Sequence, residues 1–177
     1  MTVDDVSERI KRAALNRFVA VGFGSSTVDE IAASACVGVA SLYRRWPDKA
    51  ALANELLVDH LTALESALEP VEGDSESDKD RFLVLWQRLW EQAKADRELL
   101  LFVEGQVHAG FMTEEVAEQK QATADRWMQA MTEFGMSADP ATATSLLVGT
   151  LTAAWQHELE LDGDELGTRL WAALTAA

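Results

Sequence analysis

The sequence is poor in the features that mark secreted and membrane-spanning proteins. Its 177 residues contain a single cysteine, Cys36, so no disulfide can form within the chain. The longest apolar stretches, 99–103 and the threonine-interrupted 146–155, are far shorter than the roughly 20 residues of a membrane-spanning helix. The first residues are acidic and lack the apolar segment of a secretory signal. We therefore expect a cytoplasmic protein with no membrane partner.

Alternation of apolar and polar residues, which marks β-strands, is also missing from this chain. Apolar residues recur instead at helical spacing, and only three prolines are present to interrupt helices. The pattern predicts an all-α protein with about nine helices and no internal repeat. The expected helices cover residues 5–21, 28–35, 38–45, 49–68, 82–95, 98–108, 113–134, 140–161 and 164–176.

One segment near the N-terminus carries the most informative pattern. Thr27 followed by Glu30 predicts a capping box, in which each side chain bonds the other residue's backbone N–H, at the start of a short helix. Gly38 can begin a second short helix with Leu42 as its buried anchor, and Pro47 ends it. Asp48 is a good N-cap for the long helix that follows. Two short helices joined by a tight turn are typical of a helix-turn-helix, whose second helix enters the DNA major groove. An ordinary helical hairpin with solvated arginines is the alternative.

The second of these helices would present a mixed face to DNA. Val39 and Ala40 can touch thymine methyl groups, and Arg44 can bond guanine in bidentate fashion. Lys49 can clamp a phosphate together with the first-turn N–H groups of the next helix. The full set of expected DNA-binding residues is Thr27, Gly38, Val39, Ala40, Ser41, Tyr43, Arg44, Arg45 and Lys49.

Residues 7 to about 58 resemble the TetR family of bacterial transcriptional regulators. The resemblance rests on Ile10, Ala14, Phe18, Gly22-Phe23, Thr27-Val28, Ile31-Ala32, the run from Leu42 to Lys49, and Ala51-Leu52. It implies an N-terminal three-helix DNA-binding domain over residues 1–48. A C-terminal helical ligand-binding and dimerisation domain would then cover residues 49–177.

Two positions depart from the family's pattern. Cys36 stands in the turn where relatives usually carry glycine, and a left-handed backbone there costs on the order of 1 kcal/mol. Gly38 opens the second helix where relatives usually carry Ser or Thr, so a hydroxyl that would contact phosphate is missing. Hydrogen-bond readout of DNA must then rely on Ser41, Tyr43, Arg44 and Arg45.

Positive charge is scarce for a DNA-binding protein, since 15 Lys and Arg stand against 30 Asp and Glu, a net charge of −15. Most of the excess acid lies outside the motif. Residues 1–59 hold seven basic and eight acidic side chains, whereas residues 60–177 hold eight basic and 22 acidic ones. Because few phosphates would be neutralised, we expect weak non-specific DNA affinity with a shallow salt dependence.

The expected helix 140–161 has Asp139 as its predicted N-cap, followed by proline at the first helical position. Small residues recur every four positions along it, which lets another helix approach closely. The approach could occur within one chain or across a dimer. The resemblance favours a homodimer, because TetR-family proteins pair through their last two long helices. A two-half-site operator also needs two motifs at a fixed separation. The expected interface residues are Ser145, Gly149, Thr152, Ala153, Gln156, Leu170 and Trp171.

The middle of the chain is rich in large apolar side chains. In a TetR-type regulator such helices enclose a pocket for a small apolar or amphipathic effector. Simple core packing is the alternative for each of these residues. The expected lining residues are Trp86, Trp90, Phe102, Gln106, Phe111, Trp127 and Met131.

No catalytic constellation stands out, so we expect no enzymatic activity, no metal site and no cofactor. The glycine pair at Gly22 and Gly24 follows an expected helix instead of a strand, unlike a nucleophile elbow. We expect a ligand-released repressor that binds a palindromic operator as a homodimer. The rival hypothesis is a helical ligand-binding or adaptor protein that has lost specific DNA binding.

Overall fold

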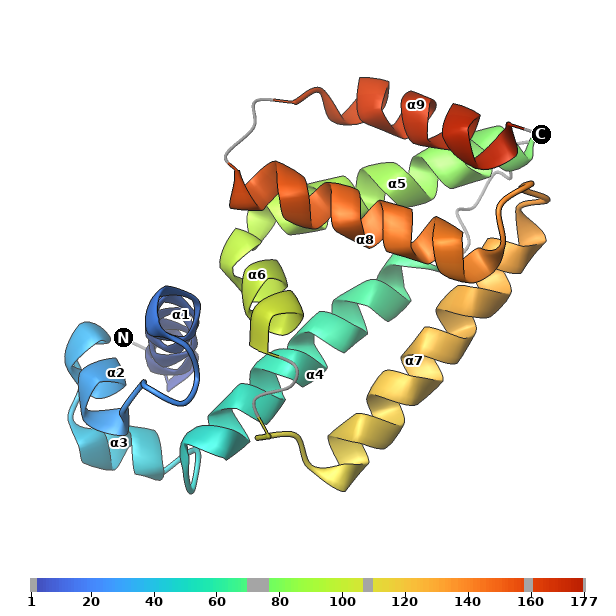
Figure 1. Ribbon diagram of the computed structural model, residues 1–177. Helices are drawn as coiled ribbons and strands as arrows, with labels where there is room; N and C mark the ends of the chain where they lie inside the picture. Colours follow the sequence, from blue (N-terminus) through green and yellow to red (C-terminus); the bar gives the residue numbers. More distant parts are fainter. Residues whose placement is uncertain (1–2, 70–76, 107–109, 158–160, 177) are drawn as a thin grey trace. The chain divides into compact units, whose positions relative to one another are not determined.

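The computed structural model describes residues 3–69, 77–106, 110–157 and 161–176 (Figure 1). Within these ranges the regular structure consists of nine α-helices without a strand, so the predicted all-α class is confirmed. The helices are α1 (Val3–Val21), α2 (Val28–Ser34), α3 (Val39–Tyr43), α4 (Lys49–Ala67), α5 (Asp78–Ala95), α6 (Arg97–Gln106), α7 (Glu114–Glu133), α8 (Pro140–Gln156) and α9 (Gly163–Thr175). None of them, over the part of the chain described, is both long and apolar enough to cross a membrane.

The chain forms two compact units whose boundaries differ from the predicted domains 1–48 and 49–177. Unit 1 comprises residues 1–60 and 98–117, and unit 2 comprises residues 61–97 and 118–177. The first half of α4 belongs to unit 1 because its side chains contact α1 and the end of α3. Helix α6 joins the same unit, since the Phe102 ring stacks on Phe18 of α1 at 5.2 Å.

The core of unit 1 is built around a cluster of phenylalanine rings from segments distant in sequence. Phe18 packs on Phe23 at 5.5 Å, Phe23 on Phe111 at 4.9 Å, and Phe102 on Phe111 at 5.6 Å. Burying an apolar side chain of this size contributes about 1.5–3 kcal/mol. Asn54 fastens the same region, because its amide donates to Phe111 O and accepts from Thr113 N. The cluster therefore fixes α1 and the α1–α2 loop against α6 and the start of α7.

In unit 2, helices α5, α8 and α9 lie side by side (Figure 1). Two glycines of α9 face two tryptophans of α5. A Cβ at Gly167 would lie 2.3 Å from Trp86 Cδ1, and one at Gly163 would lie 2.5 Å from Trp90 Nε1. The Trp86 indole also donates to Gly163 O at 2.6 Å. The close approach of α9 to α5 therefore depends on glycine at both positions.

Most helices begin close to the residues predicted from the sequence, but the start of α5 and the end of α8 differ from the prediction. Asp139 caps α8 as predicted, accepting from the N–H groups of Ala141 and Thr142. Helix α5 begins at Asp78, four residues before the predicted start, because the Ser77 hydroxyl accepts from Asp80 N and caps it. Helix α8 ends at Gln156 instead of near residue 161, and residues 158–160 lie outside the described ranges.

Candidate nucleic-acid interface

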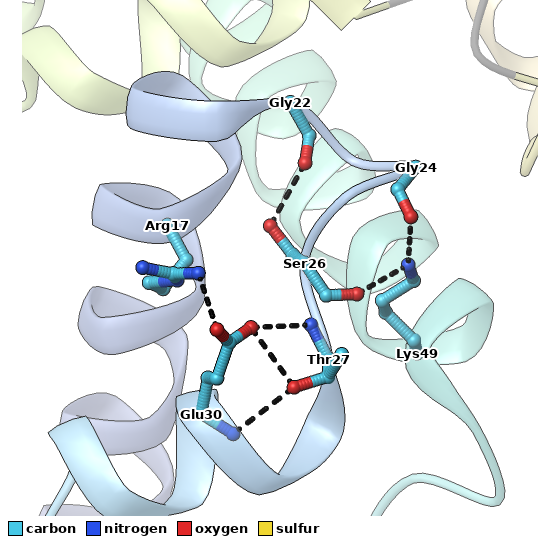
Figure 2. A network of polar contacts seen from close by, with 7 residues as sticks. All are labelled: Arg17, Gly22, Gly24, Ser26, Thr27, Glu30 and Lys49. Carbon is cyan, nitrogen blue, oxygen red and sulfur yellow. Dashed lines mark hydrogen bonds and ion pairs between the residues drawn. The ribbon is translucent and has the colours of Figure 1, made fainter.

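The predicted capping box at the start of α2 is present. The Thr27 hydroxyl accepts from Glu30 N at 3.3 Å, and Thr27 N donates to the Glu30 carboxylate at 3.1 Å (Figure 2). Arg17 of α1 approaches the same carboxylate at 2.9 Å. Hydrogen bonds from Thr27, supported by the Arg17 charge, hold the pKa of Glu30 below its ordinary value. The Thr27 side chain is therefore engaged in fixing α2.

The turn between α2 and α3 has the left-handed residue that the sequence comparison with relatives suggested. Cys36 has φ 53°, and its exposed side chain carries the free thiol. The guanidinium of Arg9 donates to Ala35 O at 2.7 Å and to Cys36 O at 3.2 Å. A cation at carbonyls that end a helix is favourable both as a hydrogen-bond donor and in the helix dipole. Arg9 of α1 thus fastens this turn.

Helix α3 buries one side and exposes the other. Leu42 is fully buried, as predicted from the motif. Ala40, Tyr43 and Arg44 are exposed, Tyr43 to 51%. Val39 and Ser41 are half-buried. The exposed set, together with the exposed Gly38 at the helix start, is what we call the α3 face.

The two adjacent arginines at the end of α3 have different partners. Arg44 donates to the hydroxyl of the half-buried Ser41 at 2.9 Å, three residues back along the chain. The Arg45 guanidinium lies 5.6 Å from the centre of the Trp46 ring, and its Nη2 lies 3.9 Å from the Glu55 carboxylate of α4. Arg44 therefore adds a cation to the α3 face, whereas Arg45 packs toward α4.

Glu55 is the centre of a polar network that sequence reasoning missed. Its carboxylate accepts from Trp46 Nε1 at 2.7 Å and pairs with Lys11 of α1 at 2.9 Å. Lys11 also bonds Asp59 at 2.8 Å. Burial raises the pKa of Glu55, but the hydrogen bonds from Lys11 and Trp46 outweigh it, so the net pKa is lowered. The network ties α1, the end of α3 and α4 together.

Lys49, predicted to clamp a phosphate, has three carbonyl partners within the protein. Its ammonium donates to Phe23 O at 2.5 Å. It also donates to Ser26 O at 2.6 Å and to Gly24 O at 3.4 Å (Figure 2). Asp48 caps α4 as predicted, with Ala51 N donating to its carboxylate at 2.8 Å. The helix start is thus formed as expected, but its lysine is turned to the α1–α2 loop.

The residues predicted to line an effector pocket are distributed over the two units. Phe102 and Phe111 belong to unit 1, whereas Trp86, Trp90, Trp127 and Met131 belong to unit 2, and all six are buried. Trp86 and Trp90 pack on the glycines of α9, so their rings fill the core of unit 2. The side chain of Gln106 lies outside the described residues.

The predicted dimer residues divide into exposed and internal ones. Ser145, Gly149, Ala153 and Gln156 of α8 are exposed, as is Leu146 to 42%, and Thr152 is half-buried. Leu170 of α9 is 9% exposed, and Trp171 packs on Phe82 at 5.3 Å. Leu170 and the half-buried Trp171 therefore make contacts within their own chain, and their place in a dimer interface stays a prediction. An exposed stripe of α8 remains.

Comparison with known proteins places this fold among transcriptional regulators. Residues 10–56 match the family model described as bacterial regulatory proteins, tetR family. An uncharacterised HTH-type transcriptional regulator of Mycobacterium bovis is 26% identical over 117 residues, which are 66% of this chain. The chain spans 60% of the length of that relative.

Solved structures of regulators have the same fold. A TetR-family transcriptional regulator from Bordetella parapertussis is 18% identical, with a TM-score of 0.79 over 96% of this chain and 93% of that one. The transcriptional regulator FadR from Bacillus subtilis, solved in complex with stearoyl-CoA, is 15% identical, with a TM-score of 0.70 over 96% of this chain and 97% of that one.

A helix-turn-helix within the segment that matches the family model defines a DNA-binding domain of the kind found in transcriptional regulators. Residues 10–56 carry the DNA-binding segment described by the tetR family model, and the described chain shares its fold with solved TetR-family regulators. The family resemblance predicted from the sequence is confirmed over residues 10–56.

Proposed function

We propose that the protein is a cytoplasmic, ligand-released repressor that binds a palindromic operator as a homodimer, with the α3 face in the major groove. The observation that carries this proposal is the exposed end of α3. An aromatic side chain that is 51% exposed stands beside an exposed arginine on a helix whose opposite side is fully buried. A face that only needed solvation would have no use for Tyr43 there.

The side chains on and next to the α3 face are suited to contacts with DNA. Arg44 offers a fork that matches the two acceptors of guanine, and Val39 and Ala40 offer apolar contact to thymine methyl groups. The Tyr43 hydroxyl can reach phosphate. Thr27, Arg45 and Lys49 are left out of the proposed direct contacts, because their polar atoms are engaged in fixing the helices. Few cations thus remain for phosphates, which supports the predicted shallow salt dependence.

The exposed stripe of α8 is the proposed site of dimerisation. Ser145, Gly149 and Ala153 recur every four residues with Leu146 beside them, and these small side chains allow a second helix to approach closely. A second copy would supply the two DNA-binding motifs that a palindromic operator requires. Sedimentation of Gly149→Leu should show monomers if the stripe is the interface, with operator binding lost in parallel.

Unit 2 carries polar atoms that suit a bound effector. Trp127 Nε1, Thr152 Oγ1 and Trp155 Nε1 are buried, with no hydrogen-bond partner among the described residues. Buried polar groups are normally satisfied, so these donors suit a ligand or water that accepts hydrogen bonds within apolar surroundings. An acyl-CoA is the effector class to test first, because FadR of B. subtilis was solved with stearoyl-CoA. Failure of acyl-CoAs to release the operator would exclude that class.

Selection of bound sequences from random duplex DNA tests the central proposal. The expected result is a palindromic consensus bound by a dimer. Arg44→Ala should then weaken operator binding by about 1–3 kcal/mol and relax the preference at one base position. Arg169→Ala removes an exposed arginine of α9 that pairs with Glu165 of the same helix, and it should leave binding unchanged. Absence of enrichment at low salt would instead favour the adaptor hypothesis.

A further inference from the structure

Lys49 carries its charge at the electrostatically unfavourable end of α4. It is the first residue of the helix, where the aligned peptide dipoles place partial positive charge that disfavours a cation. A lysine at this position needs compensation from elsewhere. The compensation comes from the α1–α2 loop, three of whose carbonyl oxygens surround the ammonium at 2.5, 2.6 and 3.4 Å.

The loop carbonyls converge on Lys49 because the loop is tightly folded. Gly22 has φ 86°, which turns the chain at the end of α1. The Ser26 hydroxyl donates back to Gly22 O at 2.8 Å, and Ser26 is buried (Figure 2). The Lys49 ammonium also lies 4.4 Å from the centre of the Phe23 ring, within cation–π range. An ammonium has three donors, and the loop offers three acceptors.

Ser26 directly precedes Thr27, the residue that caps α2. The chain of contacts therefore runs from α4 through Lys49 and Ser26 to the capping box, and from there to α2. We propose that Lys49 is a positioning residue: it fixes the α1–α2 loop to α4, and thereby sets the orientation of α2 and the α3 face, without itself contacting a phosphate. This inference rests on the proposed DNA-binding role of the α3 face.

The two roles of Lys49 predict different salt dependence. Each phosphate that a protein neutralises contributes about 0.9 to the slope of log affinity against log salt concentration for duplex DNA. Lys49→Met removes the charge and keeps an apolar stem of similar length. If Lys49 positions the loop, operator affinity should fall about tenfold while the slope stays at its wild-type value. If Lys49 clamps a phosphate, the slope should become shallower by about 0.9.

A second variant tests charge against geometry. Lys49→Arg keeps the charge and would bind a phosphate at least as well, but its planar fork does not fit three converging carbonyls beside an aromatic ring. The positioning role predicts that Lys49→Arg remains weaker than wild type, and a phosphate clamp predicts full recovery. Lys94→Met, which removes an exposed lysine of α5, is the control for loss of one positive charge.

Amide hydrogen exchange gives a readout that needs no DNA. In Lys49→Met, the amides of residues 22–30 should exchange at least about tenfold faster than in wild type, because the loop has lost its donor. The control Lys94→Met should leave them unchanged. Unchanged exchange in Lys49→Met, or a slope reduced by about 0.9, would overturn the positioning role. If wild type bound no DNA, the proposed function would fail, and the exchange measurement would still decide the role of Lys49.

Discussion

The helix-turn-helix of unit 1 and the α5–α9 pair of unit 2 are held by different kinds of interaction. Helices α2 and α3 have seven and five residues, lengths at which an isolated helix is not stable. Polar side chains from other elements fasten their ends: Arg9 at the end of α2, and Lys49 at the loop before it. Helices α5 and α9 have 18 and 13 residues and pack tryptophan rings on glycines.

The difference shows where each unit is vulnerable. Short helices have little surface to bury, so side-chain hydrogen bonds to their terminal carbonyls and N–H groups replace the missing packing. The DNA-binding region should therefore respond to lost charges and to pH. The α5–α9 contact should respond to added volume, because a packed interior has no room for an extra methyl group.

Gly167→Ala should have the largest effect on stability. The new Cβ would lie 2.3 Å from Trp86, against the ring and not against a flexible chain end. We expect a loss of about 2–3 kcal/mol in the free energy of unfolding, measured by urea denaturation. Gly105→Ala in α6 meets nothing within 4 Å and should instead gain about 0.5–1 kcal/mol from helix propensity. Equal effects of the two substitutions would show that the glycine contact is not tight.

Arg9→Met should rank second. It leaves Ala35 O and Cys36 O without their donor next to a left-handed cysteine, and unsatisfied acceptors of this kind cost about 1–3 kcal/mol. We expect a loss of about 1–2 kcal/mol in stability, at the lower end because the site is partly exposed. Operator affinity should fall as well, since the turn sets α3. Arg12→Met, which loses a half-exposed pair with Glu98, should cost less than about 1 kcal/mol. A smaller loss for Arg9→Met than for Arg12→Met would contradict the role of Arg9.

The Glu55 network should make the stability of the protein depend on pH. We expect this effect on stability to be smaller than that of Arg9→Met. The pKa of Glu55 is lowered in the folded protein despite its burial, so the unfolded chain binds more protons at acidic pH. The network's stabilisation is present above the ordinary glutamate pKa and is lost as pH falls through the lowered one. Glu55→Gln should flatten the decline of thermal stability in this acidic range, and Lys11→Met should flatten it similarly. An identical decline in wild type and Glu55→Gln would remove Glu55 from this role.

Features encoded within a few residues were predictable from the sequence, and contacts between distant segments were not. The Thr27 capping box, the Asp48 and Asp139 caps and the buried Leu42 all follow from local spacing. Arg9 bonds carbonyls 26 residues away, and on its own helix it is one of several polar outer residues. No local signal distinguishes it from its neighbours.

The sequence also could not separate pocket residues from core residues, for a physical reason of the same kind. Large apolar side chains fill a core or line a cavity, and their sequence pattern is the same in both cases. The sequence did contain a signal for the close contact between α9 and α5. Gly163 and Gly167 are four residues apart and mark a face that another helix can approach closely. The same spacing was used for Ser145 and Gly149, where the stripe proved to be exposed.

Gly38→Ser should have the smallest effect on stability. It tests the helix-turn-helix of unit 1 most directly, because Gly38 lies on the α3 face. Gly38 has φ −74° and ψ 144°, values open to any residue, and an added Cβ would meet nothing within 4 Å. It caps α3 without a side-chain hydrogen bond, so serine should add a few tenths of a kcal/mol to stability. In the proposed complex, the new hydroxyl can also donate to a phosphate, which should tighten operator binding a few-fold, as measured by anisotropy titration against the exposed-loop control Gly24→Ser. Weaker binding by Gly38→Ser would have a different meaning: the backbone at Gly38 would approach DNA too closely to admit a side chain, and the glycine would itself be a contact residue.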